Sequence, residues 1–146
     1  GCVYACASPV FLKNEIRLYY GGSDWLHFSW RKGCLALATL RPDGFAGYVQ
    51  EKRNEPAKLG TESFFTKKGV IKISADIEKD GLLSAKLLSP AGDLVKEARL
   101  DRSCVDFDLF TSVPDHEAQY RIEFELHAAK LFSYALDEQV QGEQKL

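Results

Sequence analysis

A strict alternation of apolar and polar side chains between Tyr120 and His127 constrains the fold of this chain more than any other feature. The apolar members are Tyr120, Ile122, Phe124 and Leu126, and a charged or polar residue follows each of them. A period of two places successive side chains on opposite faces of a β-strand, so that one face is buried and the other is solvated. The segment therefore predicts a strand with one wet face.

Similar patterns recur along the chain, separated by turn signals. Ile71, Ile73 and Ala75 alternate with polar residues, and Lys79-Asp80-Gly81 then predicts a hairpin turn that sends residues 83–87 back along the same strand. About ten short strands at spacings of about 8–12 residues, with no amphipathic helix between them, are typical of an all-β sandwich or barrel. We therefore predict an antiparallel β-sandwich of jelly-roll type.

The length of 146 residues suits one domain. We place a single β-sandwich domain in residues 1–137 and a polar C-terminal tail in residues 138–146. Within the sandwich, a short connection at residues 128–130 is expected to separate the strand that ends at His127 from another strand over residues 131–136.

The composition is that of a globular protein, with 45% hydrophobic and 27% charged residues. No apolar run approaches the roughly 20 residues that a membrane-spanning helix requires. Lys and Arg number 19 and Asp and Glu number 21, for a formal charge of -2, and no basic stripe follows a strand as a phosphate backbone would require. We therefore expect neither a membrane nor a nucleic-acid partner, and no cofactor motif is present.

Four cysteines, Cys2, Cys6, Cys34 and Cys104, leave two interpretations open. Two long-range disulfides would suit a secreted protein, and four buried thiols would suit a cytosolic one. A bond within an extended segment from Cys2 to Cys6 is excluded, because the two Cα atoms would lie about 13 Å apart. We favour the disulfides and, with them, an extracellular, secreted protein.

Metal binding is not expected from the ligand spacing. The cysteines lack the paired arrangement typical of zinc sites, and the three histidines are scattered along the chain. The aspartates within residues 106–115 could supply oxygen ligands for calcium, but a solvated sheet edge explains them equally well.

The densest group of side chains suited to binding lies between two predicted strands near the N-terminus. Residues 16–20 alternate as a half-buried strand, which Gly21-Gly22 is expected to end. Residues 34–40 form an apolar run typical of a buried strand, and Arg41-Pro42-Asp43-Gly44 closes that run with turn chemistry. The loop between the two strands holds both tryptophans of the protein.

Two motifs in this region are specific enough to suggest a family. They are IRLYYGGSD at residues 16–24, with His27 shortly after, and LALATLRPDGFAGY at residues 35–48, and weaker echoes follow at residues 60–65 and 120–134. The chain thereby resembles the C-terminal β-sandwich region of glycosidase-like proteins related to glycoside hydrolase families 32 and 43. The resemblance implies an association with carbohydrate.

The same resemblance argues against catalysis by this chain. In that family a five-bladed propeller holds the catalytic carboxylates, and such a propeller needs far more than 146 residues. Glycoside hydrolysis requires two carboxylates about 5–10 Å apart, and only Asp24 and Asp43 stand beside the aromatic loop. We therefore expect a protein that is not an enzyme, with residual glycoside hydrolysis as the minority alternative.

Sugars pack their apolar faces on aromatic rings and pair their hydroxyls with carboxylate, guanidinium and imidazole groups. Structural roles are also open, since the tryptophans could pack in a core, His27 could hold a loop, and Arg41 could pair with Asp43. We predict a carbohydrate-binding site made by Tyr20, Asp24, Trp25, His27, Trp30, Arg31, Arg41 and Asp43.

Three functions follow from these observations. The first is a non-catalytic, lectin-like carbohydrate-binding protein, whose weak single site gains avidity in a homo-oligomer. The second is a structural accessory module of a glycosidase-like propeller protein, and the third is a trimmed glycoside hydrolase. We favour the lectin-like protein.

Overall fold

The computed structural model describes residues 1–24, 26–28, 32–65, 69–113 and 119–138. Within these ranges the chain forms eleven strands and no helix. The strands make two antiparallel sheets, one of four strands and one of seven. The prediction of an all-β, antiparallel protein is therefore confirmed, whereas the jelly-roll topology stays a prediction.

The chain contacts group into two compact units, residues 1–45 and residues 46–146. We call them unit 1 and unit 2. Each unit contains a sheet of its own, and the single domain over residues 1–137 stays a prediction. The described residues contain no helix long and apolar enough to cross a membrane.

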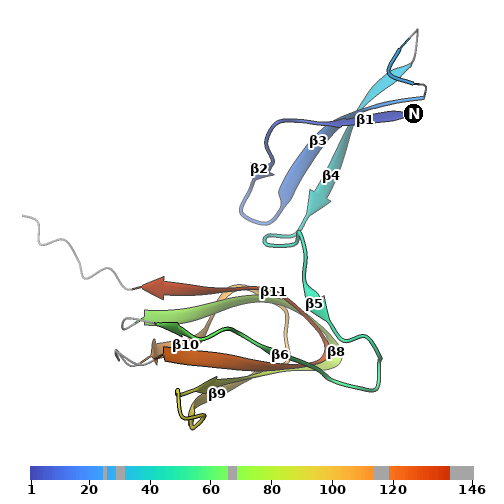
Figure 1. The fold of residues 1–146 in the computed structure, drawn as a ribbon. Coiled ribbons are helices and arrows are strands. Elements are labelled where there is room, and N and C mark those ends of the chain that lie inside the picture. The colour runs from blue at the N-terminus through green and yellow to red at the C-terminus, as the bar shows by residue number, and fades with distance from the viewer. Residues whose placement is uncertain (25, 29–31, 66–68, 114–118, 139–146) are drawn as a thin grey trace, which may run out of the picture. The chain divides into compact units, whose positions relative to one another are not determined.

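Unit 1 is organised around one central strand. Its strands are β1 (Cys2–Ala5), β2 (Val10–Phe11), β3 (Ile16–Ser23) and β4 (Gly33–Leu40). β3 pairs with β4 over its whole length, while β1 and β2 pair with the two ends of its other edge. Gly21 and Gly22 lie within β3 (Figure 1), so the prediction that this pair ends the strand is wrong. They remain in the ladder because both β1 and β4 pair with them.

The turn predicted after β4 is confirmed. The amide of Gly44 donates to the carbonyl of Arg41 at 3.0 Å, which closes a β-turn around Pro42 and Asp43. Asp43 has a φ of 59°, and a positive φ after proline is the mark of a type II turn. A side chain at Gly44 would collide with Arg41, since its Cβ would lie 2.6 Å from Arg41 Cγ.

Unit 2 contains two long strands and five shorter ones. The strands are β5 (Tyr48–Val49), β6 (Ala57–Gly60), β7 (Phe64–Phe65), β8 (Gly69–Leu88), β9 (Leu94–Leu100), β10 (Cys104–Val113) and β11 (Gln119–Glu138). β8 and β11 pair antiparallel from one end to the other. The remaining strands pair with one or other of these two.

The expected hairpin at Lys79-Asp80-Gly81 is wrong, because the chain bends there and does not reverse. β8 runs through the segment as one strand, and residues 82–88 pair with β11 rather than with residues 71–77. Asp80 takes a φ of 65° at the bend. On β11 the ladder shifts between His127 and Ala129, where Ala128 has a φ of 45°. The expected connection at residues 128–130 is thus a bend within β11.

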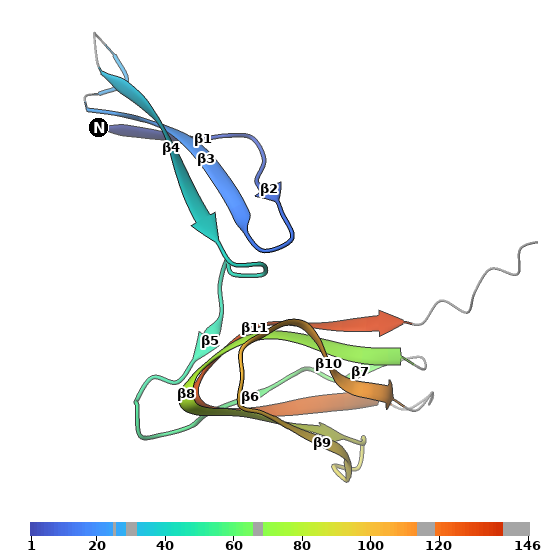
Figure 2. The ribbon, with the colours of Figure 1, turned by 180° about the vertical axis from the view of Figure 1, so that it is seen from behind.

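These matching bends fold the seven-stranded sheet over itself into two layers (Figures 1 and 2). One layer holds β10, the first half of β8, the second half of β11, and β5. The other layer holds β9, the second half of β8, the first half of β11, and β6. Each long strand therefore contributes to both layers.

The apolar positions of the predicted alternations fill the space between the layers. Ile71, Ile73 and Ala75 face the core from one half of β8, and residues 83, 85 and 87 face it from the other half. Ile122 and Leu126 on β11 are fully buried, as the alternation predicted. The inward faces of β8 and of the first half of β11 were therefore correctly predicted. The prediction of a buried strand over residues 34–40 is wrong, because six of the eight residues of β4 are exposed.

No disulfide joins the four cysteines, all of which lie in the described part of the chain. Cys2 pairs with Ser23 on one edge of β3, whereas Cys34 pairs with Gly22 on the other edge. Two strand spacings, about 10 Å, therefore separate them, which is beyond disulfide reach. Cys104 lies in unit 2, where its thiol contacts the carbonyl oxygen of Ile73 at 3.8 Å. The disulfides favoured from the sequence are wrong.

Candidate functional site

The loop after β3 is closed at its base by one aspartate. The amide of Lys32 donates to Oδ1 of Asp24 at 2.9 Å, and the amide of Asp24 donates to the carbonyl of Lys32 at 3.3 Å. This pair continues the ladder between β3 and β4 by one step. Asp24 therefore holds the loop closed.

Within this loop two aromatic rings are exposed next to each other. His27 and Phe28 pack edge to face, with ring centroids 5.4 Å apart and an interplanar angle of 88°. Phe28 is 56% exposed. The other predicted members of the site in this loop, Trp25, Trp30 and Arg31, lie outside the described residues.

The predicted site residues do not gather in one place. Ser23 pairs with Gly33 at the loop end of the β3–β4 hairpin, whereas Ile16 pairs with Leu40 at the other end. Asp24 lies beyond the first pair and Asp43 beyond the second, so more than roughly 20 Å of strand separates them. The structure therefore does not bring these two carboxylates to the spacing that glycoside hydrolysis requires.

Tyr20 and Arg41 also stand apart from the loop. Tyr20 is half-buried in the middle of β3, opposite Ala36 on β4 and Ala5 on β1. Arg41 begins the turn at the far end of the hairpin. Of the predicted residues that the structure describes, only Asp24 and His27 lie together in the loop.

A hollow beside this loop was missed by the sequence analysis. We call it the glycine hollow; it has a volume of about 390 Å³ and is lined by Tyr4, Gly21, Gly22, Ser23, Gly33, Cys34 and Leu35. Tyr4 and Leu35 pair directly with Gly21 from either side. Opposite residues in a ladder share a face, so these two side chains flank a position that has none. Tyr4 is 56% exposed and Leu35 is 76% exposed.

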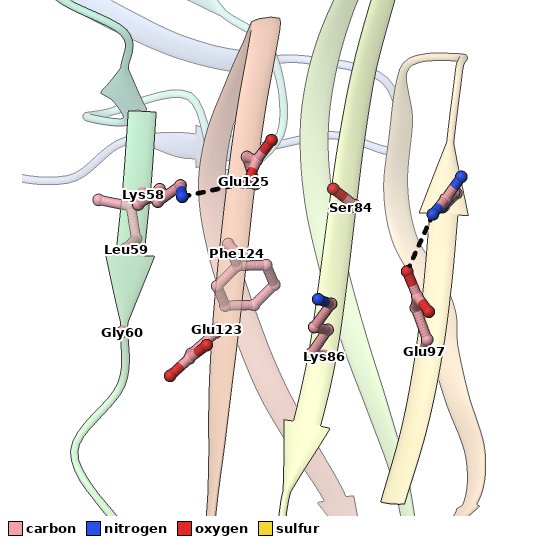
Figure 3. Close-up of a pocket in the computed structure, with 10 residues that line it drawn as sticks. Lys58, Leu59, Gly60, Ser84, Lys86, Glu97, Glu123, Phe124 and Glu125 are labelled. Atoms are coloured by element: carbon pink, nitrogen blue, oxygen red, sulfur yellow. Dashed lines mark hydrogen bonds and ion pairs between the residues drawn. The ribbon is translucent and has the colours of Figure 1, made fainter. Parts of the chain in front are cut away.

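Unit 2 has a second hollow, on the outer face of one layer (Figure 3). This charged trough has a volume of about 550 Å³. Strand register aligns its outward side chains in two rows, one of Lys58, Glu125, Ser84 and Arg99 and one of Gly60, Glu123, Lys86 and Glu97. The small residues of each row leave the space that makes the trough.

The charges of the trough pair with one another. Lys58 lies 3.8 Å from Glu125, and Arg99 lies 3.2 Å from Glu97, as the dashed lines of Figure 3 show. Such exposed pairs contribute under about 1 kcal/mol each. The aromatic ring that borders the trough, Phe124, is only 3% exposed. The trough is therefore a solvated sheet face with balanced charge, and it offers no ring for stacking.

Among the described residues, the pKa values of two cations are shifted, and each cation belongs to a surface ion pair. A hydrogen bond to Glu15, whose Oε1 accepts from Arg17 Nε at 2.7 Å, raises the pKa of Arg17. A hydrogen bond to Asp137 raises the pKa of Lys72, with a smaller contribution from Asp108. Neither cation borders the hollows described above. Among the described residues, no group of three or more His, Cys, Asp or Glu is placed to hold a metal ion.

Comparison with protein-family models, with curated proteins and with solved structures found no match.

Proposed function

We propose that this chain is a non-catalytic, lectin-like carbohydrate-binding protein whose sugar site lies in unit 1, at the glycine hollow and the adjoining loop. The observation that carries this proposal is the row Tyr4, Gly21 and Leu35, in which two exposed apolar side chains flank an empty position on a sheet. A flat sugar ring can lie over a glycine where a side chain would exclude it.

The chemistry around the hollow suits a sugar. The exposed ring of Tyr4 offers a stacking surface, and its hydroxyl can donate or accept a hydrogen bond. Ser23, at the end of β3, and the loop carboxylate of Asp24 add polar groups at the same end of the hairpin. Sites for small ligands combine apolar walls with a few polar groups in this way.

Several finer features belong to the same proposal. A lectin-like protein would agree with four of them: the jelly-roll topology, the relationship to glycoside hydrolase families 32 and 43, secretion, and assembly into a homo-oligomer that raises avidity. None of them is needed for the sugar site itself.

A printed glycan array, probed with the purified chain, tests the proposal. We expect specific binding to at least one class of neutral glycan, and Tyr4→Ala should weaken it about fivefold because one aromatic stacking contact is lost. Phe11→Ala is the matched control, since Phe11 is 67% exposed but lies on β2 at the other end of β3. An array without any signal from the folded wild-type chain would rule the proposal out.

A second function is favoured by the apolar surface of unit 1. Among the described residues of this unit, ten large apolar side chains are exposed, namely Val3, Tyr4, Val10, Phe11, Leu12, Leu26, Phe28, Leu35, Leu37 and Phe45. Surfaces of this kind mark contact with another protein layer, as in an accessory module of a glycosidase-like protein. Sedimentation velocity together with binding of a hydrophobic dye separates the two functions, because an accessory module that lacks its partner stays dye-binding and gives no array signal.

A further inference from the structure

A third hollow lies in unit 2, at the edge where β5 and β6 border the two layers. We call it the edge groove; its volume is about 610 Å³, and residues of both layers line it. We infer that the edge groove is a second sugar-binding site, with Tyr48 and Tyr134 as its stacking rings. The sugar class rests on the proposed function, whereas the site itself is independent of the glycine hollow.

The edge groove exists because the edge strands are shorter than β11. β5 covers only Lys130 and Leu131 of β11 in one layer. In the other layer, β6 covers residues 123–126. β11 continues past β5. Among the described residues, no other strand of that layer pairs with this edge of β11. The space between the layers therefore opens to solvent there.

The floor of the groove is apolar and fixed. Phe124 and Leu131 are 3% and 4% exposed, and they belong to the core of unit 2. Leu59, opposite Phe124 in the ladder, extends this floor along β6. A floor of core side chains keeps its shape when a ligand enters, so little ordering is needed on binding.

Two tyrosines stand above this floor. Tyr48 pairs with Leu131, so that the two side chains share a face, and it is 66% exposed. Tyr134 is 44% exposed, and its ring lies against Phe124 with centroids 6.3 Å apart and an angle of 45°. The contact with Phe124 holds the orientation of the Tyr134 ring while part of the ring remains open to solvent.

Polar groups border the same space. Thr61, Glu62 and Ser133 line the groove, and Lys58 borders it as well, although its ammonium group lies 3.8 Å from Glu125 on the outer face of the layer. Thr61 is held in position, because its Oγ1 accepts the amide hydrogen of Ile122 at 3.0 Å. Donors and acceptors around an apolar floor match a ligand that has apolar faces and a rim of hydroxyls. A sugar ring is such a ligand, and the volume lies within the usual range of about 300–1,000 Å³ for small-ligand sites.

The test uses the full chain and isothermal titration calorimetry with four soluble probes: maltohexaose, cellohexaose, xylohexaose and chitohexaose. The background variant Tyr4→Ala/Phe28→Ala removes two exposed rings of the unit 1 site. We expect this background to retain binding of one probe, and the added change Tyr48→Ala or Tyr134→Ala to raise its Kd about fivefold or more. Tyr48→Ala is the safer variant for folding, because Tyr48 is mostly exposed.

The matched control is Phe65→Ala, since Phe65 is 63% exposed in unit 2 and does not line the groove. If neither tyrosine substitution changed the Kd, the proposal of a sugar site in the edge groove would be contradicted. Loss of all binding in the background variant, with binding kept by the wild type, would also overturn it and leave the unit 1 site standing. Absence of binding by the wild type would remove both proposals.

Discussion

The two units of this protein are both built from antiparallel strands, yet they use their apolar residues in opposite ways. Of the 18 buried apolar residues, Ile16 alone lies among the described residues of unit 1. Unit 2 contains the other 17, because its sheet folds over itself and each layer covers the other. A sheet needs a second layer to bury its apolar face, and unit 1 has none of its own.

This difference separates stability from recognition. Burial of apolar surface contributes roughly 25 cal/mol per Å², so the folding energy of the described chain is concentrated in unit 2. The exposed apolar side chains of unit 1 contribute little to its own stability and remain available for a ligand or a partner. We therefore expect substitutions in the two units to have different consequences.

The largest expected effect is that of a core truncation in unit 2. Ile122 is fully buried between the layers, and Ile122→Ala should lower the free energy of unfolding by about 2–5 kcal/mol through lost burial and the cavity left behind. The counterpart in unit 1, Leu35→Ala, removes a side chain that is 76% exposed and should change stability by at most about 0.5 kcal/mol. Urea unfolding followed by circular dichroism measures both. Equal losses in the two variants would contradict the comparison.

The next effect concerns the bend of β8. A Cβ on Gly81 would collide with the carbonyl oxygen of Ala128 and lie 3.0 Å from the carbonyl oxygen of Glu78. Gly81→Ala should therefore destabilise the protein by about 1–3 kcal/mol. Gly60→Ala is the control, because no atom lies within 4 Å of its added Cβ. Thermal unfolding of the two variants should separate them, and equal melting temperatures would show that the bend tolerates a side chain.

A smaller effect is expected from one partly buried hydrogen bond. Thr61→Val keeps the shape of the side chain but removes the acceptor of the Ile122 amide, which should lower stability by about 1 kcal/mol. Thr39→Val on the exposed strand β4 of unit 1 serves as the matched change. If Thr39→Val lowered the free energy of unfolding in urea as much as Thr61→Val, the loss of this hydrogen bond would not explain the destabilisation.

The smallest effect is electrostatic. Lys72 donates to Asp137 at 2.7 Å, and this contact raises the pKa of Lys72 above its ordinary value. A raised pKa in the folded state gives stability that is present below the unfolded pKa, about 10.4, and is lost as the pH rises through the folded pKa. Asp137→Asn should therefore lower the pKa of Lys72, measured by NMR titration of its Cε resonance, and should reduce the loss of stability above pH 10. An unchanged pKa would show that Asp137 is not the cause.

The inward faces of β8 and β11 were predictable from the sequence, because alternation reports burial directly. The exposure of β4 was not predictable, because an apolar run does not show whether another layer covers it. The bends of β8 and β11 were not, since Lys79-Asp80-Gly81 provides the same backbone freedom for a hairpin and for a corner. Whether a hairpin or a corner forms depends on which strand pairs with the residues that follow the turn. β11 follows β8 past the corner, from Ile77 to Leu82, and a pairing between strands so distant in sequence leaves no local signal.

The candidate site shows the same limit. The sequence indicated the loop, and the structure confirms that Asp24 and His27 lie in it. The glycine hollow depends instead on a register that sets Tyr4 and Leu35 on either side of Gly21. The edge groove depends on the shortness of β5 relative to β11. Neither feature has a sequence motif, although the pair Gly21-Gly22 within β3 marked a position without side chains.

The continuous pairing of β8 with β11 has a consequence for how unit 2 unfolds. Because both strands pass through both layers, neither layer can open without breaking the ladder that also supports the other. Unit 2 should therefore lose its structure in a single cooperative transition, and the amides of this ladder should exchange with solvent only through global unfolding. Folding must first bring together strands separated by the whole of β9 and β10, so that most of the entropy loss precedes most of the contacts. The pairing of β8 with β11 therefore explains both the slow folding expected of unit 2 and the uniform protection of its amides against hydrogen exchange.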